Sequence, residues 1–278
     1  MRDQTPLSAL PTLPSATDGI APMGAVNWIG LKTLYMREVR RFIKVYTQTL
    51  VAPLITTMLF LAVFALALGG DHRVVAGMPF ITFLAPGLIM MAIAQNSFAN
   101  TSSSLMIGKI QGNIVDSLMA PLNAHELVFG FAIGGMTRGV AVAVVVGAAM
   151  ALTVDLGLHD PFFVVYHAVM GALMLSLLGL AGGIWADKFD HIAAVTNFVI
   201  TPLSFLSGTF YSIERLPEGA QIAAHFNPFF YMIDGFRYGF IGHADGNLWI
   251  GVAVMAVINI ALWCLCTWMF RTGYKLKA

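Results

Sequence analysis

Six long apolar segments alternate with shorter polar ones along most of the chain. They lie at 50–68, 79–100, 127–154, 162–184, 192–206 and 248–270. A helix needs roughly 20 apolar residues to cross a hydrocarbon core of about 30 Å, a length that these segments reach or approach. The pattern therefore predicts an all-α integral membrane protein with six transmembrane helices.

An amphipathic segment at 25–46 precedes the first of these spans. Apolar side chains recur there every three or four residues, which predicts a helix with one apolar stripe made of Trp28, Leu31, Tyr35, Val39, Phe42 and Tyr46. The opposite face carries Arg37, Arg40, Arg41 and Lys44. This arrangement is typical of an interfacial helix that lies in the headgroup plane against anionic membrane lipid. A helix packed on the protein itself is the alternative.

A polar break at 107–126 separates the second and third spans, and it is the only sizeable one in the first two thirds of the hydrophobic chain. As one helix, its central stretch, 109–121, has an apolar side made of Ile110, Ile114, Leu118 and a bend at Pro121. Asn113 and Asp116 lie elsewhere on that helix. We expect a short helix across the end of the bundle, where another protein can push it.

Polar residues also occur close to or within the spans. The second span turns polar at Gln95, Asn96, Asn100 and 101–104, so this end either reaches the membrane interface or lines an aqueous path. Arg138 stands about three turns into the third span, within reach of the membrane surface through its long side chain.

The segment 207–247 between the last two spans is too long for a simple loop and too apolar for an exposed one. We expect two short helices, Ile213–His225 with Pro217 in its first turn and Phe229–Ile241, separated by a turn at Asn227-Pro228. They would form a re-entrant hairpin that caps the outer side of the bundle. Asp234 and Arg237 are three residues apart, a spacing that favours a local ion pair; a direct role in gating is the alternative.

The first 24 residues differ from the rest. They contain four prolines among Ser, Thr and Ala, which predicts a disordered tail, and they lack the apolar core of a cleavable signal. We therefore divide the chain into this tail and one transmembrane domain at 25–278.

Composition and charge support the membrane assignment. Of 278 residues, 58% are apolar and 10% are charged, against about 25% charged residues in soluble domains. With six spans both termini lie on one side, and that side carries eleven lysines and arginines against three on the other. The positive-inside rule then predicts that both termini and the 107–126 segment are cytoplasmic, in a multi-pass protein of the cell inner membrane.

Several kinds of chemistry are absent from the sequence. Gly108-Lys109 is followed by Ile110 and lacks the spacing of a phosphate-binding Walker A loop, and His125-Glu126 has no second histidine at the spacing of a zinc site. Cys264 and Cys266 have no ligand partners nearby, and the scattered histidines are expected at the interfaces. We predict no catalytic, cofactor-binding or metal-binding residue, and hence no enzyme activity in this chain.

Two stretches resemble the membrane subunit of ABC-2-type transporters. The first is 109–121, where Lys109 and Gln111 precede Gly112, Asn113 replaces a threonine, and Asp116, Leu118 and Pro121 stand at the positions of Glu, Leu and Pro. The second is more specific and comprises Leu206-Ser207-Gly208-Thr209-Phe210-Tyr211, Pro217, Asn227-Pro228 and Asp234-Gly235-Phe236-Arg237. The order of amphipathic helix, two spans, coupling segment, three spans, outer hairpin and last span matches the same family.

The resemblance implies a partner and a mechanism. Such a permease pairs with a second copy of itself and with two copies of a separate cytoplasmic ATP-binding subunit, which binds ATP and Mg²⁺. ATP-driven closure pushes the coupling segments, and a hydrophobic, lipid-linked or drug-like substrate moves outward. No role in nucleic-acid binding is implied.

Two other functions remain as alternatives. A secondary carrier or channel would need no ATPase, but no acidic residue stands in the middle of any span, as ion coupling usually requires. A membrane-embedded lipid transferase would need clustered acids at the interface, where Asp187 and Asp190 are only two.

Overall fold

The structure, a computed structural model, describes residues 26–67, 74–75, 77–213 and 216–276. The predicted tail at 1–24 lies outside these residues. The helices and the two short strands are α1 (Trp28–Lys44), η2 (Thr47–Val51), α2 (Ala52–Ala67), β1 (Val74–Val75), β2 (Met78–Pro79), α3 (Phe80–Ile110), α4 (Ile114–Met119), α5 (Ala124–Ala151), α6 (Pro161–Trp185), α7 (Phe189–Val195), η4 (Thr196–Ile200), α8 (Thr201–Leu206), α9 (Glu218–His225), α10 (Pro228–Ile241) and α11 (Leu248–Thr272).

Six of the helical segments are long and apolar enough to cross a membrane, which confirms the number of spans predicted. Four of them are the single helices α3, α5, α6 and α11. The first span joins η2 to α2, and the fifth joins α7, η4 and α8, so each contains a short π-helical segment. The strands β1 and β2 pair antiparallel in the connection between the first two spans.

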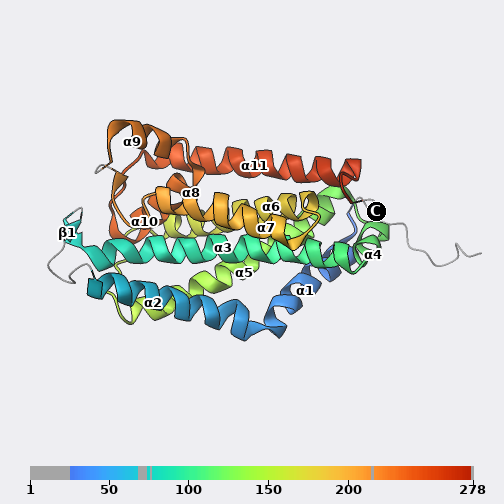
Figure 1. Cartoon of the computed structure of the whole chain (residues 1–278), viewed down its shortest axis with the longest axis horizontal. Coiled ribbons are helices and arrows are strands. Elements are labelled where there is room, and N and C mark those ends of the chain that lie inside the picture. Colours follow the sequence, from blue (N-terminus) through green and yellow to red (C-terminus); the bar gives the residue numbers. More distant parts are fainter. Residues whose placement is uncertain (1–25, 68–73, 76, 214–215, 277–278) are drawn as a thin grey trace, which may run out of the picture.

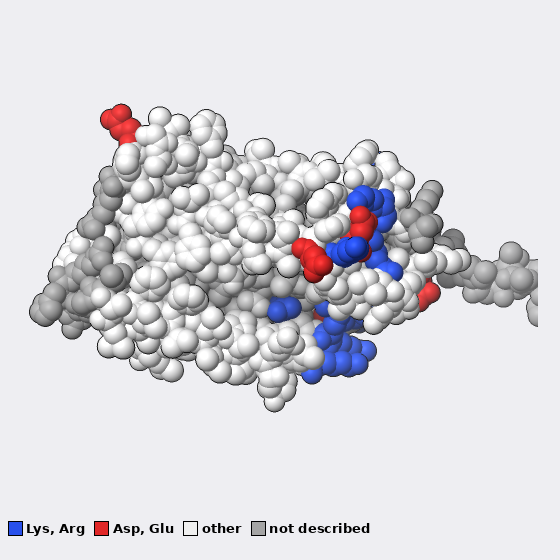
Figure 2. All heavy atoms as spheres, in the orientation of Figure 1, with Lys and Arg blue, Asp and Glu red and all other residues white. Residues whose placement is uncertain are grey.

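The spans lie side by side along the long axis of the molecule (Figure 1). One end carries α4 and the end of the chain, with α1 running obliquely beside them, and the other carries β1, α9 and α10. Lysine and arginine side chains gather at the first of these ends, and the body between the ends is almost free of charge (Figure 2). We call these two ends the basic end and the hairpin end.

The second span, α3, lies at the centre of the bundle, with 83% of its most apolar stretch buried against 11% for the first span. Glycines allow α5 and α6 to approach it closely. A Cβ atom added at Gly179 of α6 would collide with the carbonyl oxygen of Phe98 in α3. Close contact between helix backbones is how membrane helices gain packing energy, because lipid is as apolar as their side chains.

The polar end of α3 is buried within the bundle. The helix continues past Asn100 to Ile110, and Asn96, Asn100 and Thr101 are at most 8% exposed. Thr101 Oγ1 donates a hydrogen bond to the carbonyl of Ser176 in α6 at 2.7 Å. Thr101 therefore joins α3 to α6, whereas Gln95 and Asn96 line a hollow between α2 and α3. The two alternatives drawn from the sequence for this end of α3 both stay predictions.

The hairpin end contains the two short helices expected there, but the first begins later than predicted. α9 starts at Glu218 because Pro217, with φ −57° and ψ 148°, is extended and precedes the helix as its N-cap. α10 ends at Ile241, because the next residue, Gly242, has a φ of 69°, which stops a right-handed helix. A re-entrant position of α9 and α10 in the bilayer stays a prediction.

Candidate functional site

The polar stretch between α3 and α5 forms a turn and a short helix, not the single helix predicted over 109–121. α3 continues through Lys109 to Ile110, Gly112 has a φ of 75°, and α4 follows. A positive φ interrupts a right-handed helix and is readily adopted by glycine. The predicted apolar side is therefore wrong, since Ile110 is 60% exposed and Ile114 is 7% exposed.

The short helix α4 exposes one side at the basic end. Val115, Asp116 and Met119 are exposed, whereas Ile114 is buried and Leu118 packs against buried side chains of α1, α3, α5 and α6. The exposed side of α4 thus presents two apolar side chains and one carboxylate, and the other side is packed on the bundle.

The residues that flank α4 divide between solvent and the bundle. Gln111 and Asn113 are exposed, and Asn113 Nδ2 donates to Gln111 Oε1 at 3.1 Å. On the other side of α4, the carbonyl of Pro121 accepts a hydrogen bond from Asn27 Nδ2 at 3.1 Å. Both ends of the coupling segment are therefore ordered by polar contacts.

Lys109 points away from α4, toward the end of α6. Its Nζ donates to the carbonyls of Ile184 at 2.9 Å and Ala186 at 2.6 Å, groups that a helix end leaves without intrahelical partners. Lys275 reaches the same region and donates to Asp187 Oδ2 at 2.9 Å. This hydrogen bond lowers the pKa of the exposed Asp187 carboxyl below its ordinary value. The structure thus places Lys109 in a helix cap.

A buried carboxylate, Glu38, lies at the centre of the basic end, and the sequence analysis missed it. Its side chain is 1% exposed and accepts from Arg37 Nη2 at 3.3 Å and from Arg41 Nη2 at 3.0 Å. Ser104 Oγ of α3 donates to the same carboxylate at 2.9 Å. Glu38 therefore binds α1 to α3.

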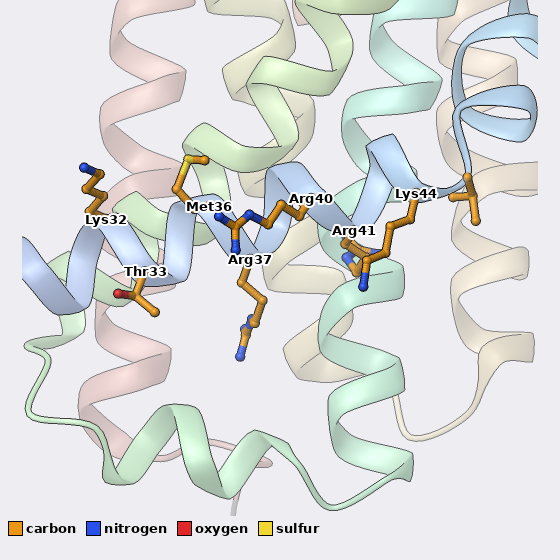
Figure 3. Close-up of a pocket in the computed structure, with 8 residues that line it drawn as sticks. Lys32, Thr33, Met36, Arg37, Arg40, Arg41 and Lys44 are labelled. Atoms are coloured by element: carbon orange, nitrogen blue, oxygen red, sulfur yellow. The ribbon is translucent and has the colours of Figure 1, made fainter.

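The two arginines extend this network to neighbouring helices. Arg37 Nη1 donates to Ser117 Oγ of α4 at 2.9 Å, and Arg41 Nη2 donates to the carbonyl of Asn100 in α3 at 2.6 Å. Arg37 is thus a polar link from α1 to the short helix, and Figure 3 shows it directed away from α1 on that side. We call Arg37, Glu38, Arg41, Ser104 and Ser117 the charged cluster.

The signal for this cluster was present in the sequence. Glu38 follows Arg37 directly and precedes Arg41 by three residues, a spacing at which helical side chains meet. It also lies four residues after Leu34 and four before Phe42, so it shares their face. An acid in an apolar stripe is costly to bury unless it is paired, and the two arginines supply the pairs.

α1 packs against the protein along one face. Leu31, Leu34, Glu38 and Phe42 are buried, and a Cβ added at Gly134 of α5 would meet Glu38 Cβ at 2.6 Å. Of the aromatic residues assigned to the apolar stripe, Trp28 and Tyr46 are 70% and 59% exposed. Of the predicted polar face, Arg40 and Lys44 are exposed, whereas Arg37 and Arg41 turn toward the charged cluster. An interfacial position of the exposed face stays a prediction.

At the hairpin end, Asn227 joins the fifth span to α10. Its Nδ2 donates to the carbonyl of Leu203 at 2.9 Å and to Ser207 Oγ at 2.8 Å, and its Oδ1 accepts from Phe229 N at 3.1 Å. Pro228 occupies the first turn of α10, where a missing N–H costs nothing. The Ser207, Asn227 and Pro228 positions singled out in the sequence therefore form one structural unit.

Asp234 and Arg237 do not form the predicted ion pair, since no ion pair among the described residues joins them. Asp234 accepts from the backbone N–H groups of Asp245 at 2.8 Å and Gly246 at 3.0 Å. Arg237 donates to the carbonyl of Gly208, and its guanidinium lies 3.9 Å from the centroid of the Phe83 ring. Although their spacing would allow contact, each side chain satisfies the backbone of a different loop.

Two further polar residues within the spans are turned into the bundle. Arg138 Nη2 donates to Asn96 Oδ1 at 2.9 Å, which joins α5 to α3, so the side chain does not extend to the membrane surface. His167 of α6 is fully buried, and its Nδ1 lies 2.9 Å from the carbonyl of Phe163. His167 is thus packed inside the bundle, and the expectation that the histidines lie at membrane interfaces stays a prediction.

These features define a multi-pass α-helical membrane protein with a short helix exposed at its basic end. A profile described as ABC-2 type transporter matches residues 30–241. The chain therefore belongs to the ABC-2 type transporter family.

Two relatives illustrate the range of the family. The chain is 38% identical to the inner membrane transport permease YadH of Escherichia coli (strain K12), over 90% of this chain and 98% of that one. It is 25% identical to nodulation protein J of Rhizobium leguminosarum bv. trifolii, over 90% of this chain and 95% of that one. Both similarities span nearly the whole of each chain.

Replacing Glu38 with glutamine tests the charged cluster. We expect Glu38→Gln to lower the free energy of unfolding by about 2 kcal/mol, less than the 3–5 kcal/mol of a fully buried pair because Arg37 and Arg41 remain partly exposed. The thermal unfolding midpoint of the detergent-purified chain measures this. Asp116→Asn, which removes an exposed carboxylate from the same end, is the matched control; equal midpoints for the two variants would contradict the assignment.

Replacing Arg237 with lysine separates charge from shape at the hairpin end. Lysine keeps a positive charge but cannot both stack on Phe83 and donate to Gly208 as a planar guanidinium does. We expect Arg237→Lys to cost about 1–3 kcal/mol of unfolding free energy in the same measurement. Wild-type stability in this variant would show that charge alone matters there.

Proposed function

We propose that this chain is the membrane subunit of an ATP-driven exporter that works with a separate ATP-binding subunit. The observation that carries the proposal is α4, which exposes Val115, Asp116 and Met119 at the basic end while its other side is held by the bundle. A helix exposed on one side and fixed on the other can receive a force and pass it on. The sequence contains no Walker A loop, so the force must come from another chain.

The distribution of charge supports a cytoplasmic position for α4. Nine lysines and arginines of the described residues belong to the basic end: Lys32, Arg37, Arg40, Arg41, Lys44, Lys109, Lys188, Arg271 and Lys275. Arg237, at the hairpin end, is buried. Under the positive-inside rule the basic end faces the cytoplasm, and with it α1, α4 and the end of α11. The relative YadH is named an inner membrane permease, in keeping with this location.

The charged cluster suggests the route of the force. A push on α4 acts on α1 through Ser117 and Arg37, and on α3 through Glu38 and Ser104. Because α3 lies at the centre of the bundle, its displacement changes the contacts of α5 and α6 together. In a dimer of two such chains, this movement would open an outward path for a hydrophobic, lipid-linked or drug-like substrate.

Co-purification tests the dependence on an ATPase. The affinity-tagged chain, solubilised from its native membrane, is expected to retain an ABC ATP-binding subunit and nucleotide hydrolysis. If the chain is isolated with neither an ATP-binding subunit nor nucleotide hydrolysis, and the purified chain takes up substrate into liposomes without nucleotide, a secondary carrier or channel is favoured instead.

Charge reversal on α4 tests the coupling surface. We expect Asp116→Lys to lower transport and transport-coupled ATPase activity at least severalfold, because the carboxylate is exposed on the proposed contact surface. Membrane insertion and the thermal midpoint should remain near wild type. If a normally folded Asp116→Lys variant keeps wild-type transport and transport-coupled ATPase activity, α4 does not have the role proposed for it.

A further inference from the structure

A hollow of about 740 Å³ runs along α1, and five cations line it: Lys32, Arg37, Arg40, Arg41 and Lys44 (Figure 3). All five come from α1, and neighbouring members of the set are one to five residues apart. Their side chains therefore spread along the helix and do not converge on one point. The hollow therefore resembles a groove that fits several anionic groups side by side.

Most of this positive charge is uncompensated within the described part of the chain. Lys32, Arg40 and Lys44 are exposed and form no hydrogen bond or ion pair with a described residue. The carboxylate of Glu38 is shared by Arg37 and Arg41. Five cations around one acid leave the groove strongly attractive to anions.

The groove also lies at the level where the chain enters the membrane. The first span begins at Thr47, three residues after Lys44. Beside the cations, the apolar side chains of Ile43, Val45 and Tyr46 are 52%, 46% and 59% exposed. Apolar side chains next to lysine and arginine at the start of a span fit the boundary between acyl chains and headgroups.

We propose that this groove binds the phosphate groups of anionic phospholipids from the leaflet at the basic end. Lysine and arginine bind phosphate by charge, and arginine adds paired N–H donors that match its oxygens. Anionic lipid supplies both parts that the surface fits, a phosphate for the cations and acyl chains for the apolar neighbours. An acidic protein surface would supply only the first part.

The bound lipid would act on the coupling helix. Arg37 lines the groove and also donates to Ser117 of α4, and Arg41 lines it and also binds Glu38. A phosphate in the groove therefore shares donors with the charged cluster, and its presence changes the strength of the contact between α1 and α4. This consequence rests on the proposed function, but the binding itself does not.

The test compares two double variants of the full chain, each lacking two exposed cations of the basic end. Arg40→Gln with Lys44→Gln removes two groove cations that bind no described residue. Lys188→Gln with Arg271→Gln, outside the groove, is the matched control. Native mass spectrometry counts the lipid retained after incubation with dioleoylphosphatidylglycerol or dioleoylphosphatidylcholine, without nucleotide or partner.

We expect the wild-type chain and the control to retain phosphatidylglycerol in preference to phosphatidylcholine. The groove variant should lose about fivefold in phosphatidylglycerol affinity for each cation removed, or roughly 25-fold in all. Exchanging the two cations, as Arg40→Lys with Lys44→Arg, should keep affinity within about twofold, since charge is unchanged. Equal thermal midpoints show that the variants are folded.

Two results would overturn the proposal. If the wild-type chain retains the two lipids equally, the groove has no preference for anionic lipid. If both double variants lose phosphatidylglycerol alike, binding depends on the total charge of the basic end and not on the groove. If lipid preference is absent and the groove variant instead loses the co-purified ATPase, the groove is a protein-docking surface. Because lipid binding is measured on the isolated chain, failure of the exporter proposal would leave this result unaffected.

Discussion

The basic end depends on one buried carboxylate. Glu38 is held by Arg37, Arg41 and Ser104, and through them α1 is fixed to α3 and α4. A carboxylate so deeply buried is tolerated only when hydrogen-bond donors surround it, so the position of α1 depends on these three partners. The short helix α4 has only six residues and could not hold its own position. It is the cluster and the apolar contacts beneath it that make α4 part of the bundle.

Polar contacts also join helices inside the apolar bundle. The central helix α3 brings several polar side chains into the interior, and some of them bind neighbouring helices, whereas the Asn100 side chain has no hydrogen-bond partner among the described residues. Thr101 binds a carbonyl of α6, and Asn96 receives a hydrogen bond from Arg138 of α5. Such contacts require short distances between helices, which glycines such as Gly179 permit. Polar contacts and close backbone packing therefore occur together around α3, which is the most buried of the six spans among the described residues.

The two ends use their charged residues differently, which fits a protein driven from one side. At the hairpin end, Asp234 and Arg237 satisfy the backbone of two separate loops, and Arg237 is almost fully buried. Such residues fix a structure and leave little charge for a partner. At the basic end, the exposed cations of α1 and the exposed side of α4 leave surface for lipid and protein.

The sequence by itself determined the six spans, the amphipathic helix before them and the family, because hydrophobic periodicity and length decide which segments cross a membrane. It also located both regions of interest, at 107–126 and 207–247. Tertiary structure decided which groups the side chains in these regions contact. Glycine at 112 divides the coupling segment, Lys109 caps α6, Asp234 and Arg237 bind different loops, and Glu38 joins three helices. Spacing along a helix says which side chains share a face but not which neighbouring helix that face meets. A buried polar group is satisfied by whatever donor or acceptor the packing brings within reach, and that is set by contacts between residues far apart in the chain.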